Sequence, residues 1–291
     1  MIRRGFADLP DRQVHYRHAG EGPPLLMIHA SPGSSKQLEG KIAALAQRRS
    51  VIAPDTPGNG DSTPLALPAP EIGDYADALV RFLDVVGLQR CDVYGTHTGA
   101  NIGLELAIRA PERVGRLVLD GVGLFPEAER RRYLDRYARP IEVDLAGSQY
   151  LRAFMFCRDQ YLFWPWFETG RENRRDGGLP SPEALHDWVL EVLKALGTYH
   201  LSYRAAFAYP ARERLTELKR PVMLIAAGSD PLADQTREAA ALLPGARFRD
   251  LPHGADPGFG EAFVAAVHSF LAEGDAPSGI PRRRKRSWLR R

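Results

Sequence analysis

The chain is poor in cysteine and has no long apolar run. Cys91 and Cys157 are its two cysteines in 291 residues, too few for the disulfide framework of a small secreted domain. The opening residues are not followed by an apolar signal segment, and no apolar run approaches the roughly 18 residues that a membrane span needs. We therefore expect a cytoplasmic protein that is neither exported nor inserted into a membrane.

The usual nucleotide-binding motifs are also missing. The Gly-rich stretch from Gly95 to Gly103 lacks the Lys-Ser/Thr pair of a phosphate loop, and no dinucleotide fingerprint is present. The helix-spaced histidine pair of a zinc protease is absent as well. No cofactor is therefore expected.

The charge balance gives no reason to expect a nucleic-acid partner. The formal net charge is +3, but seven of the 39 Lys and Arg residues, and none of the 36 Asp and Glu residues, lie from Ala276 onward. Residues 1–275 are thus slightly acidic. A basic end of this kind either contacts a polyanion or a membrane surface, or is solvated and disordered. We interpret residues 276–291 as a disordered tail.

The apolar pattern predicts an α/β fold. With 44% hydrophobic residues the chain can bury a full core, and short apolar runs alternate with helical segments, which is typical of a parallel sheet covered by helices on both faces. The stretch around residues 13–17 alternates instead and ends in glycines, as an antiparallel edge hairpin would. The predicted strands are Pro24–Ile28, Val51–Ala53, Cys91–Tyr94, Arg116–Leu119 and Pro221–Ile225.

The strand rhythm stops between Leu124 and Phe207. This part is helical and rich in aromatic residues, and we interpret residues 124–207 as a cap inserted into a single domain of residues 1–275. Its rings either form the cap's own core or line an apolar pocket for a small organic substrate. Trp164 is a candidate pocket residue. Arg158 is another, and it would either bind a substrate carboxylate or pair with Asp159.

The segment Gly95-Thr96-His97-Thr98-Gly99 places a small-residue turn between a predicted strand and a predicted helix. This is the context of a G-x-Nuc-x-G nucleophile elbow, which projects its central residue above the carboxyl end of the sheet. At the start of a helix that residue also lies beside backbone N–H groups that have no partner in the helix.

At this point the chain resembles the α/β-hydrolase superfamily. His29 to Ser35 is similar to the family's oxyanion loop H-G-x-P-x-S, Asp55 to Ser62 matches D-x-P-G-x-G-x-S, and Leu251 to Gly254 is similar to the segment that carries the catalytic histidine. The resemblance implies a mostly parallel eight-stranded sheet flanked by helices, with an inserted helical cap. One departure stands out, since His97 occupies the elbow where the family has serine, cysteine or aspartate.

The resemblance also implies the partners of the elbow residue. His253 is the expected general base and acid, and Asp230 the carboxylate that accepts a hydrogen bond from it. Asp230 follows its glycine by two residues where the family usually has three, so Asp120 and Asp234 remain alternatives. His29 is interpreted as structural, shaping the oxyanion loop.

With a histidine at the elbow, several mechanisms remain open. His97 either attacks a carbonyl itself or, as we favour, activates water, with the amide of Thr98 and one near Ala30 and Ser31 stabilising the oxyanion. That would hydrolyse an ester, a lactone or a similar bond. The imidazoles would alternatively transfer protons, as in a lyase, an isomerase or a cofactor-free oxygenase, or the site would be an inactive binding module.

A metal site built from His97, His253 and Asp230 is a further alternative, because two imidazoles and a carboxylate are a plausible ligand set. We favour a metal-free enzyme that acts on a small molecule, with no specific nucleic-acid partner. The sequence leaves open whether the protein forms a homo-oligomer.

Overall fold

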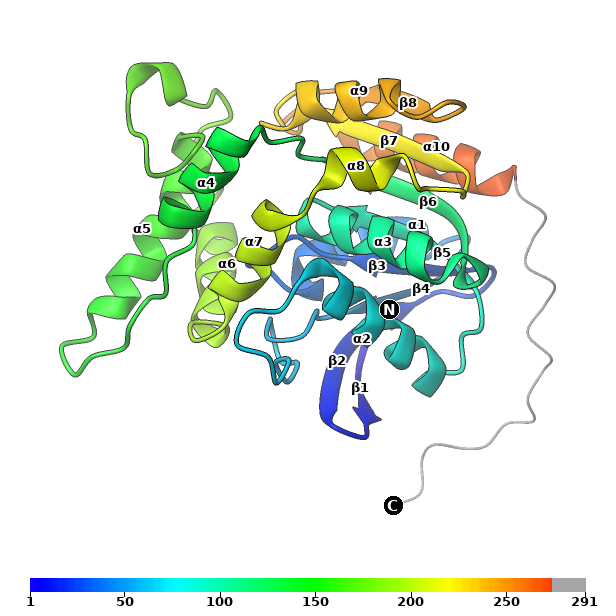
Figure 1. Cartoon of the computed structure of the whole chain (residues 1–291), viewed down its shortest axis with the longest axis horizontal. Helices are drawn as coiled ribbons and strands as arrows, with labels where there is room; N and C mark the ends of the chain where they lie inside the picture. The colour runs from blue at the N-terminus through cyan, green and yellow to red at the C-terminus, as the bar shows by residue number, and fades with distance from the viewer. Residues whose placement is uncertain (274–291) are drawn as a thin grey trace.

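The strands form one eight-stranded sheet in the order β1-β2-β4-β3-β5-β6-β7-β8 (Figure 1). This computed structural model describes residues 1–273, so the predicted tail lies outside the described residues. Strand β2 runs antiparallel to both of its neighbours, β1 and β4, and β3 to β8 run parallel to one another. The predicted mostly parallel sheet with its edge hairpin is confirmed. The strands are β1 (Arg3–Leu9), β2 (Arg12–Ala19), β3 (Pro24–Ile28), β4 (Ser50–Pro54), β5 (Cys91–Thr96), β6 (Val114–Asp120), β7 (Val222–Ala227) and β8 (Arg247–Leu251).

Helices cover both faces of the sheet because successive strand residues point to opposite sides. On β3, Leu26 and Ile28 pack in one core with α2, α3, α8 and α9, whereas Leu25 and Met27 pack in another with α1 and α10. The central strand β3 is apolar and buried at every residue, as expected for a strand in a parallel sheet that is covered on both faces. The helices are α1 (Glu39–Leu45), α2 (Ile72–Val85), α3 (Thr98–Arg109), α8 (Ala211–Leu215), α9 (Ala233–Ala241) and α10 (Phe259–Ala272).

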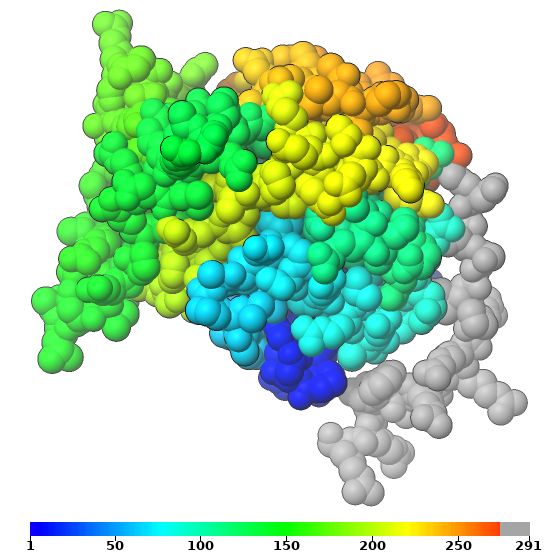
Figure 2. Space-filling model, viewed as in Figure 1, coloured from blue at the N-terminus to red at the C-terminus, as the bar shows by residue number. Residues whose placement is uncertain are grey.

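Four further helices lie between β6 and β7, and we call them the cap. They stand beyond one end of the sheet (Figures 1 and 2) and have a core of their own, built around Tyr133, Tyr137, Phe156 and Tyr203. Most of the aromatic rings predicted for this segment therefore serve the cap core. The cap helices are α4 (Glu127–Arg136), α5 (Ser148–Leu162), α6 (Pro182–Lys194) and α7 (Tyr199–Ala208).

The sheet determines where a site can form. In an open parallel sheet the loops at the carboxyl ends of the strands meet at one edge, and here the loops after β3, β5, β6 and β7 all contribute to one cavity. Both cysteines are buried free thiols. None of the helices within residues 1–273 has the length and apolar character that crossing a bilayer requires.

Candidate active site

The nucleophile elbow forms where β5 ends and α3 begins. His97 has φ 50° and ψ −112°, and it is the one non-glycine residue with positive φ in the described part of the chain. Its N–H donates to the carbonyl of Asp120 (2.8 Å), and its carbonyl accepts from Ala100 N–H (2.9 Å). Gly95 and Gly99 allow this turn because neither position has room for a Cβ. A Cβ at Gly95 would collide with the backbone of Gly99, and a Cβ at Gly99 would collide with the backbone of Ile28. The backbone of His97 is therefore strained, and both its N–H and its carbonyl are hydrogen-bonded.

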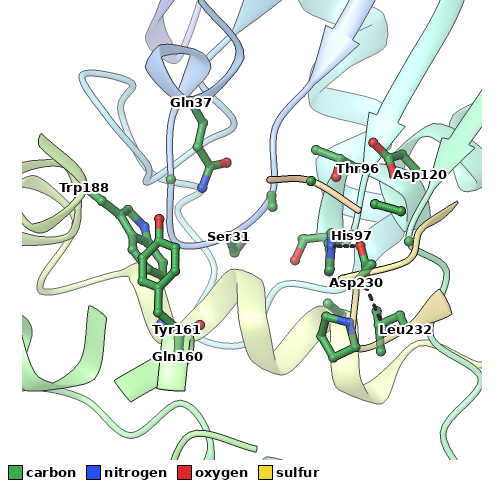
Figure 3. Close-up of a pocket in the computed structure, with 18 of the residues that line it drawn as sticks. Ser31, Gln37, Thr96, His97, Asp120, Gln160, Tyr161, Trp188, Asp230 and Leu232 are labelled. Atoms are coloured by element: carbon green, nitrogen blue, oxygen red, sulfur yellow. Dashed lines mark hydrogen bonds and ion pairs between the residues drawn. The ribbon is translucent and has the colours of Figure 1, made fainter. Parts of the chain in front are cut away.

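The His97 side chain reaches the acid of the site directly. Its Nε2 lies 2.9 Å from Oδ2 of Asp230 (Figure 3), and the other carboxylate oxygen, Oδ1, accepts from Leu232 N–H (2.8 Å). The His97 side chain is 33% exposed and that of Asp230 is 11% exposed. Asp230 is thus fixed between a backbone amide and the elbow imidazole, so it orients His97.

The environment determines the proton positions of this pair. Burial opposes charge on both groups and is the largest single effect. The charge and hydrogen bond of the partner, together with other neighbouring groups, outweigh it, so the pKa of His97 is raised from 6.5 and the pKa of Asp230 is lowered. An ionised carboxylate only accepts hydrogen bonds, so Nε2–H donates to Asp230. Nδ1 makes no hydrogen bond with residues 1–273 and remains available to act on a ligand.

His253 is not part of this arrangement. The expected hydrogen bond to Asp230 is absent within residues 1–273, and His253 Nδ1 instead accepts from Ala255 N–H (3.2 Å). His253 lines a neighbouring cavity of about 520 Å³, and Asp230 lines both that cavity and the one that contains His97. The physical reason is side-chain length: an imidazole on the elbow spans the gap to Asp230 that a serine would leave for the second histidine.

The two alternative acids have other partners. Asp120 binds Lys41 Nζ (3.0 Å) through Oδ2, which also accepts a hydrogen bond from the Tyr94 hydroxyl. Asp120 lines the same cavity as His97, and its charge contributes to the raised pKa of His97, after the larger effects of burial and Asp230. Asp234 is exposed and pairs with Arg237. Asp230 is therefore the acid that contacts His97, with Asp120 as an outer neighbour.

The oxyanion loop is held by a buried, neutral histidine. His29 Nε2 accepts from Thr56 N–H (2.9 Å), so its Nδ1–H donates to the carbonyl of Ala30 (2.8 Å). Burial lowers the pKa of His29, which keeps this tautomer uncharged. The Ser31 hydroxyl donates to Ser202 of α7 (2.8 Å) and ties the loop to the cap. Ala30, Ser31 and Thr98 all line the cavity, as the predicted oxyanion site requires.

The cavity between elbow and cap measures about 640 Å³. Figure 3 shows Gln37, Tyr161 and Trp188 across the cavity from His97. Trp164 also lines it, as predicted, while packing against Tyr137. Other aromatic lining residues are Phe125, Tyr137, Tyr203, Phe207 and Phe259.

The structure places Arg158, a candidate pocket residue, outside the lining of this cavity. Its Nε and Nη2 donate to the adjacent Asp159 (2.8 and 2.6 Å). The second interpretation of Arg158, a structural pair, is the one that the structure bears out.

Sequence reasoning missed several residues of the cavity, and three of them lie near charged groups of the site or beside His97. Lys41 comes from α1, Gly121 follows Asp120, and Arg175 comes from the chain between α5 and α6. A Cβ on Gly121 would lie 2.9 Å from His97 Nε2 and 3.1 Å from Asp230 Oδ2. A glycine directly after a strand that ends at the elbow edge was a usable signal, whereas Lys41 and Arg175 carry no motif.

The alternative metal site does not assemble. Within residues 1–273, ligand atoms of three His, Cys, Asp or Glu residues come close enough to hold a metal only at His15, Asp55 and Asp61. There Asp55 accepts from His15, Ser35 and the amide of Asp61. These hydrogen bonds stabilise the loop after β4 and occupy both carboxylate oxygens of Asp55.

Comparison with known proteins agrees with this geometry. Residues 23–159 match the family model described as alpha/beta hydrolase fold. A protein provisionally named carbamate hydrolase RutD, from Caulobacter sp. (strain K31), is 25% identical over 283 residues, covering 93% of this chain and 98% of the relative. Over residues 23–159 the chain is therefore similar to proteins with the alpha/beta hydrolase fold.

Solved structures show the same fold. A hydrolase from Pseudomonas aeruginosa PA01 superposes with a TM-score of 0.71 at 23% identity, over 92% of this chain and 98% of that one. The enol-lactonase from Burkholderia xenovorans LB400 superposes with a TM-score of 0.68 at 21% identity, over 92% of this chain and all (100%) of that one. The predicted α/β-hydrolase fold is confirmed.

Proposed function

We propose that this protein is a metal-free hydrolase that cleaves an ester, lactone or similar carbonyl bond of a small organic substrate, with His97 as general base. The observation that carries the proposal is the contact between His97 Nε2 and Asp230 Oδ2 at 2.9 Å. It fixes the imidazole with Nδ1 as its free basic nitrogen, in a cavity that also contains the oxyanion loop. A named hydrolase relative over nearly the full chain supports the reaction class.

The proposed reaction needs one base and one acid, and His97 serves as both. Neutral His97 takes a proton from water through Nδ1 while the water oxygen attacks the carbonyl carbon. The amides of Thr98 and Ser31 stabilise the oxyanion of the tetrahedral intermediate. The imidazolium, stabilised by Asp230, then returns the proton to the departing oxygen as the carbon–oxygen bond breaks.

The test is turnover of chromogenic short-chain esters and of lactones by the purified protein, beside His97→Ala and with a chelator. We expect hydrolysis that is lost in His97→Ala and insensitive to the chelator. Activity that persists in His97→Ala would contradict the proposal, and loss with chelator would point to metal catalysis instead.

One observation favours a second candidate, proton transfer on carbon. The cavity contains a single imidazole with one free nitrogen beside a carboxylate, and a base of that kind also suits an isomerase or a lyase. Incubation of carbonyl compounds in heavy water distinguishes the two. Deuterium uptake at the carbon next to the carbonyl without hydrolysis, lost in His97→Ala, would favour proton transfer.

A further inference from the structure

We propose that Arg175 recognises a carboxylate on the substrate, so that the enzyme acts on small organic acids that carry the scissile bond. This inference rests on the proposed function, because it names the substrate class for the same cavity. Arg175 lines that cavity and is half-buried in its wall.

The first argument is the charge balance of the cavity. Lys36 pairs with Asp187 (2.9 Å), and Lys41 pairs with Asp120 (3.0 Å). Arg175 forms no ion pair with any residue in the range 1–273. Of Lys36, Lys41 and Arg175, which are the described Lys and Arg residues that line this cavity, Arg175 is thus the one without an ion pair in that range.

Most acidic side chains of the cavity have a cation of their own. Glu39 pairs with Arg17, and Glu191 pairs with Lys194. Asp230 contacts His97 and accepts from Leu232 N–H, and the charge of Arg175 helps to lower the pKa of Asp230, after the larger effects of burial and His97. Within residues 1–273 Asp230 forms no ion pair with Arg175, so the guanidinium remains open to a carboxylate that enters the cavity.

The second argument is how Arg175 is held. Its Nη1 donates to the carbonyl of Gln160 (2.6 Å) and its Nη2 to the carbonyl of Ser229 (3.1 Å). Neutral carbonyls orient the guanidinium without cancelling its charge. Three of its five N–H groups make no hydrogen bond with residues 1–273, and a planar guanidinium held in place suits bidentate binding of a carboxylate.

The third argument is its position next to the proposed base. Ser229, which accepts from Arg175, directly precedes Asp230 in the loop that orients His97. A substrate whose carboxylate binds Arg175 is therefore anchored beside the His97–Asp230 pair. The aromatic residues Trp164 and Phe207 in the same cavity offer contacts for the carbon skeleton.

A binding experiment tests this without relying on catalysis. Trp164 and Trp188 line the cavity, so quenching of tryptophan fluorescence reports on occupancy. The probes are 3-phenylpropionate and its neutral amide, titrated into the wild-type protein, Arg175→Gln and Arg175→Lys. We expect the acid to bind wild type at least tenfold more tightly than the amide, a ratio near one in Arg175→Gln, and an intermediate ratio in Arg175→Lys.

Two controls separate recognition from a structural role. Arg158→Gln removes an arginine of the cap that does not line the cavity and should leave the ratio unchanged. If Arg175 only fastened the cap to Ser229, acid and amide would weaken equally in Arg175→Gln. Equal binding of acid and amide by wild type, or binding of neither at millimolar concentration, overturns the proposal.

The same titration distinguishes this inference from the proposed function. His97→Ala should keep the preference for the acid even though turnover is lost. If the wild type prefers the acid but hydrolyses no ester or lactone, carboxylate recognition stands and the hydrolase proposal fails. If it hydrolyses neutral and acidic esters equally well and binds both equally, the hydrolase proposal stands and the role of Arg175 fails.

Discussion

Two loops at the same edge of the sheet each carry a histidine, and the two histidines differ in their hydrogen-bond partners and in the cavity that they line. The loop after β5 gives His97 a carboxylate partner and a free Nδ1 in a large cavity. The loop after β8 leaves His253 with a local bond to Ala255 N–H in a neighbouring cavity. Since both loops lie within reach of Asp230, the length of the elbow side chain decides which imidazole obtains the acid.

The largest expected effect is the difference in reaction rate between substitutions of the two histidines. His97→Ala should lower the rate of the wild-type reaction by at least about 10²-fold, the usual contribution of a general base. His253→Ala should stay within about threefold of wild type, because its ring neither contacts Asp230 nor lines the cavity. Initial rates on one substrate check both, with circular dichroism to confirm folding. Comparable losses in the two variants would restore His253 to the catalytic group.

Asp230→Asn should change both the rate and its pH dependence. His97 acts as a base only when neutral, so the rate rises as pH increases through its pKa, which lies above 6.5 in the wild type. Removing the negative charge of Asp230 lowers that pKa, and the acid limb of the profile should move to lower pH. The maximal rate should fall about 10-fold or more because the imidazole is no longer oriented. A pH–rate profile with an unmoved acid limb would show that Asp230 does not govern His97.

Gly121→Ala should disturb the contact between His97 and Asp230 and leave His253 as it is. The new Cβ would lie 2.9 Å from His97 Nε2, at a residue with φ +77°. We expect a loss of about 1–2 kcal/mol in the free energy of unfolding and a rate reduced about tenfold. Gly245→Ala is the matched control, since Gly245 has φ +80° and its Cβ would meet no atom within 4 Å. Equal behaviour of the two variants in thermal melts and assays would contradict the crowding argument.

The smallest effect concerns the strain at the elbow itself. His97→Gly and His97→Ala both lose the bond to Asp230, but only glycine adopts φ 50° without steric cost. His97→Gly should therefore be more stable than His97→Ala by about 1 kcal/mol, measured as the difference in unfolding free energy in urea. The reverse order would mean that the elbow backbone relaxes once the imidazole is gone.

The sequence predicted most of the sheet because the central strands are short apolar runs in which every residue is buried, as in Pro24–Ile28. Strand β8 had no such pattern. Its residues Arg247–Leu251 are mostly polar and lie at the edge of the sheet, so only pairing with β7 identifies it. Edge strands of this kind are determined by the neighbouring strand rather than by their own composition.

The site was predictable in its parts but not in its connections. The elbow, the oxyanion loop and Asp230 follow from local motifs, and the structure brings them to one cavity. The pairing of His97 with Asp230 depends on how far a side chain reaches across space, which no motif encodes. Arg175 was missed for a related reason, since two backbone carbonyls from distant segments hold it.

The contact between His97 and Asp230 also bears on how this gene can change. Either histidine codon becomes an aspartate codon through one base substitution, so an elbow of the aspartate type is one mutational step away. An aspartate side chain is shorter than that of histidine, so at the elbow it would not fill the gap that His97 now spans to Asp230. The genetically nearest conversion of this elbow therefore removes the imidazole that Asp230 orients and leaves Asp230 open to a second histidine.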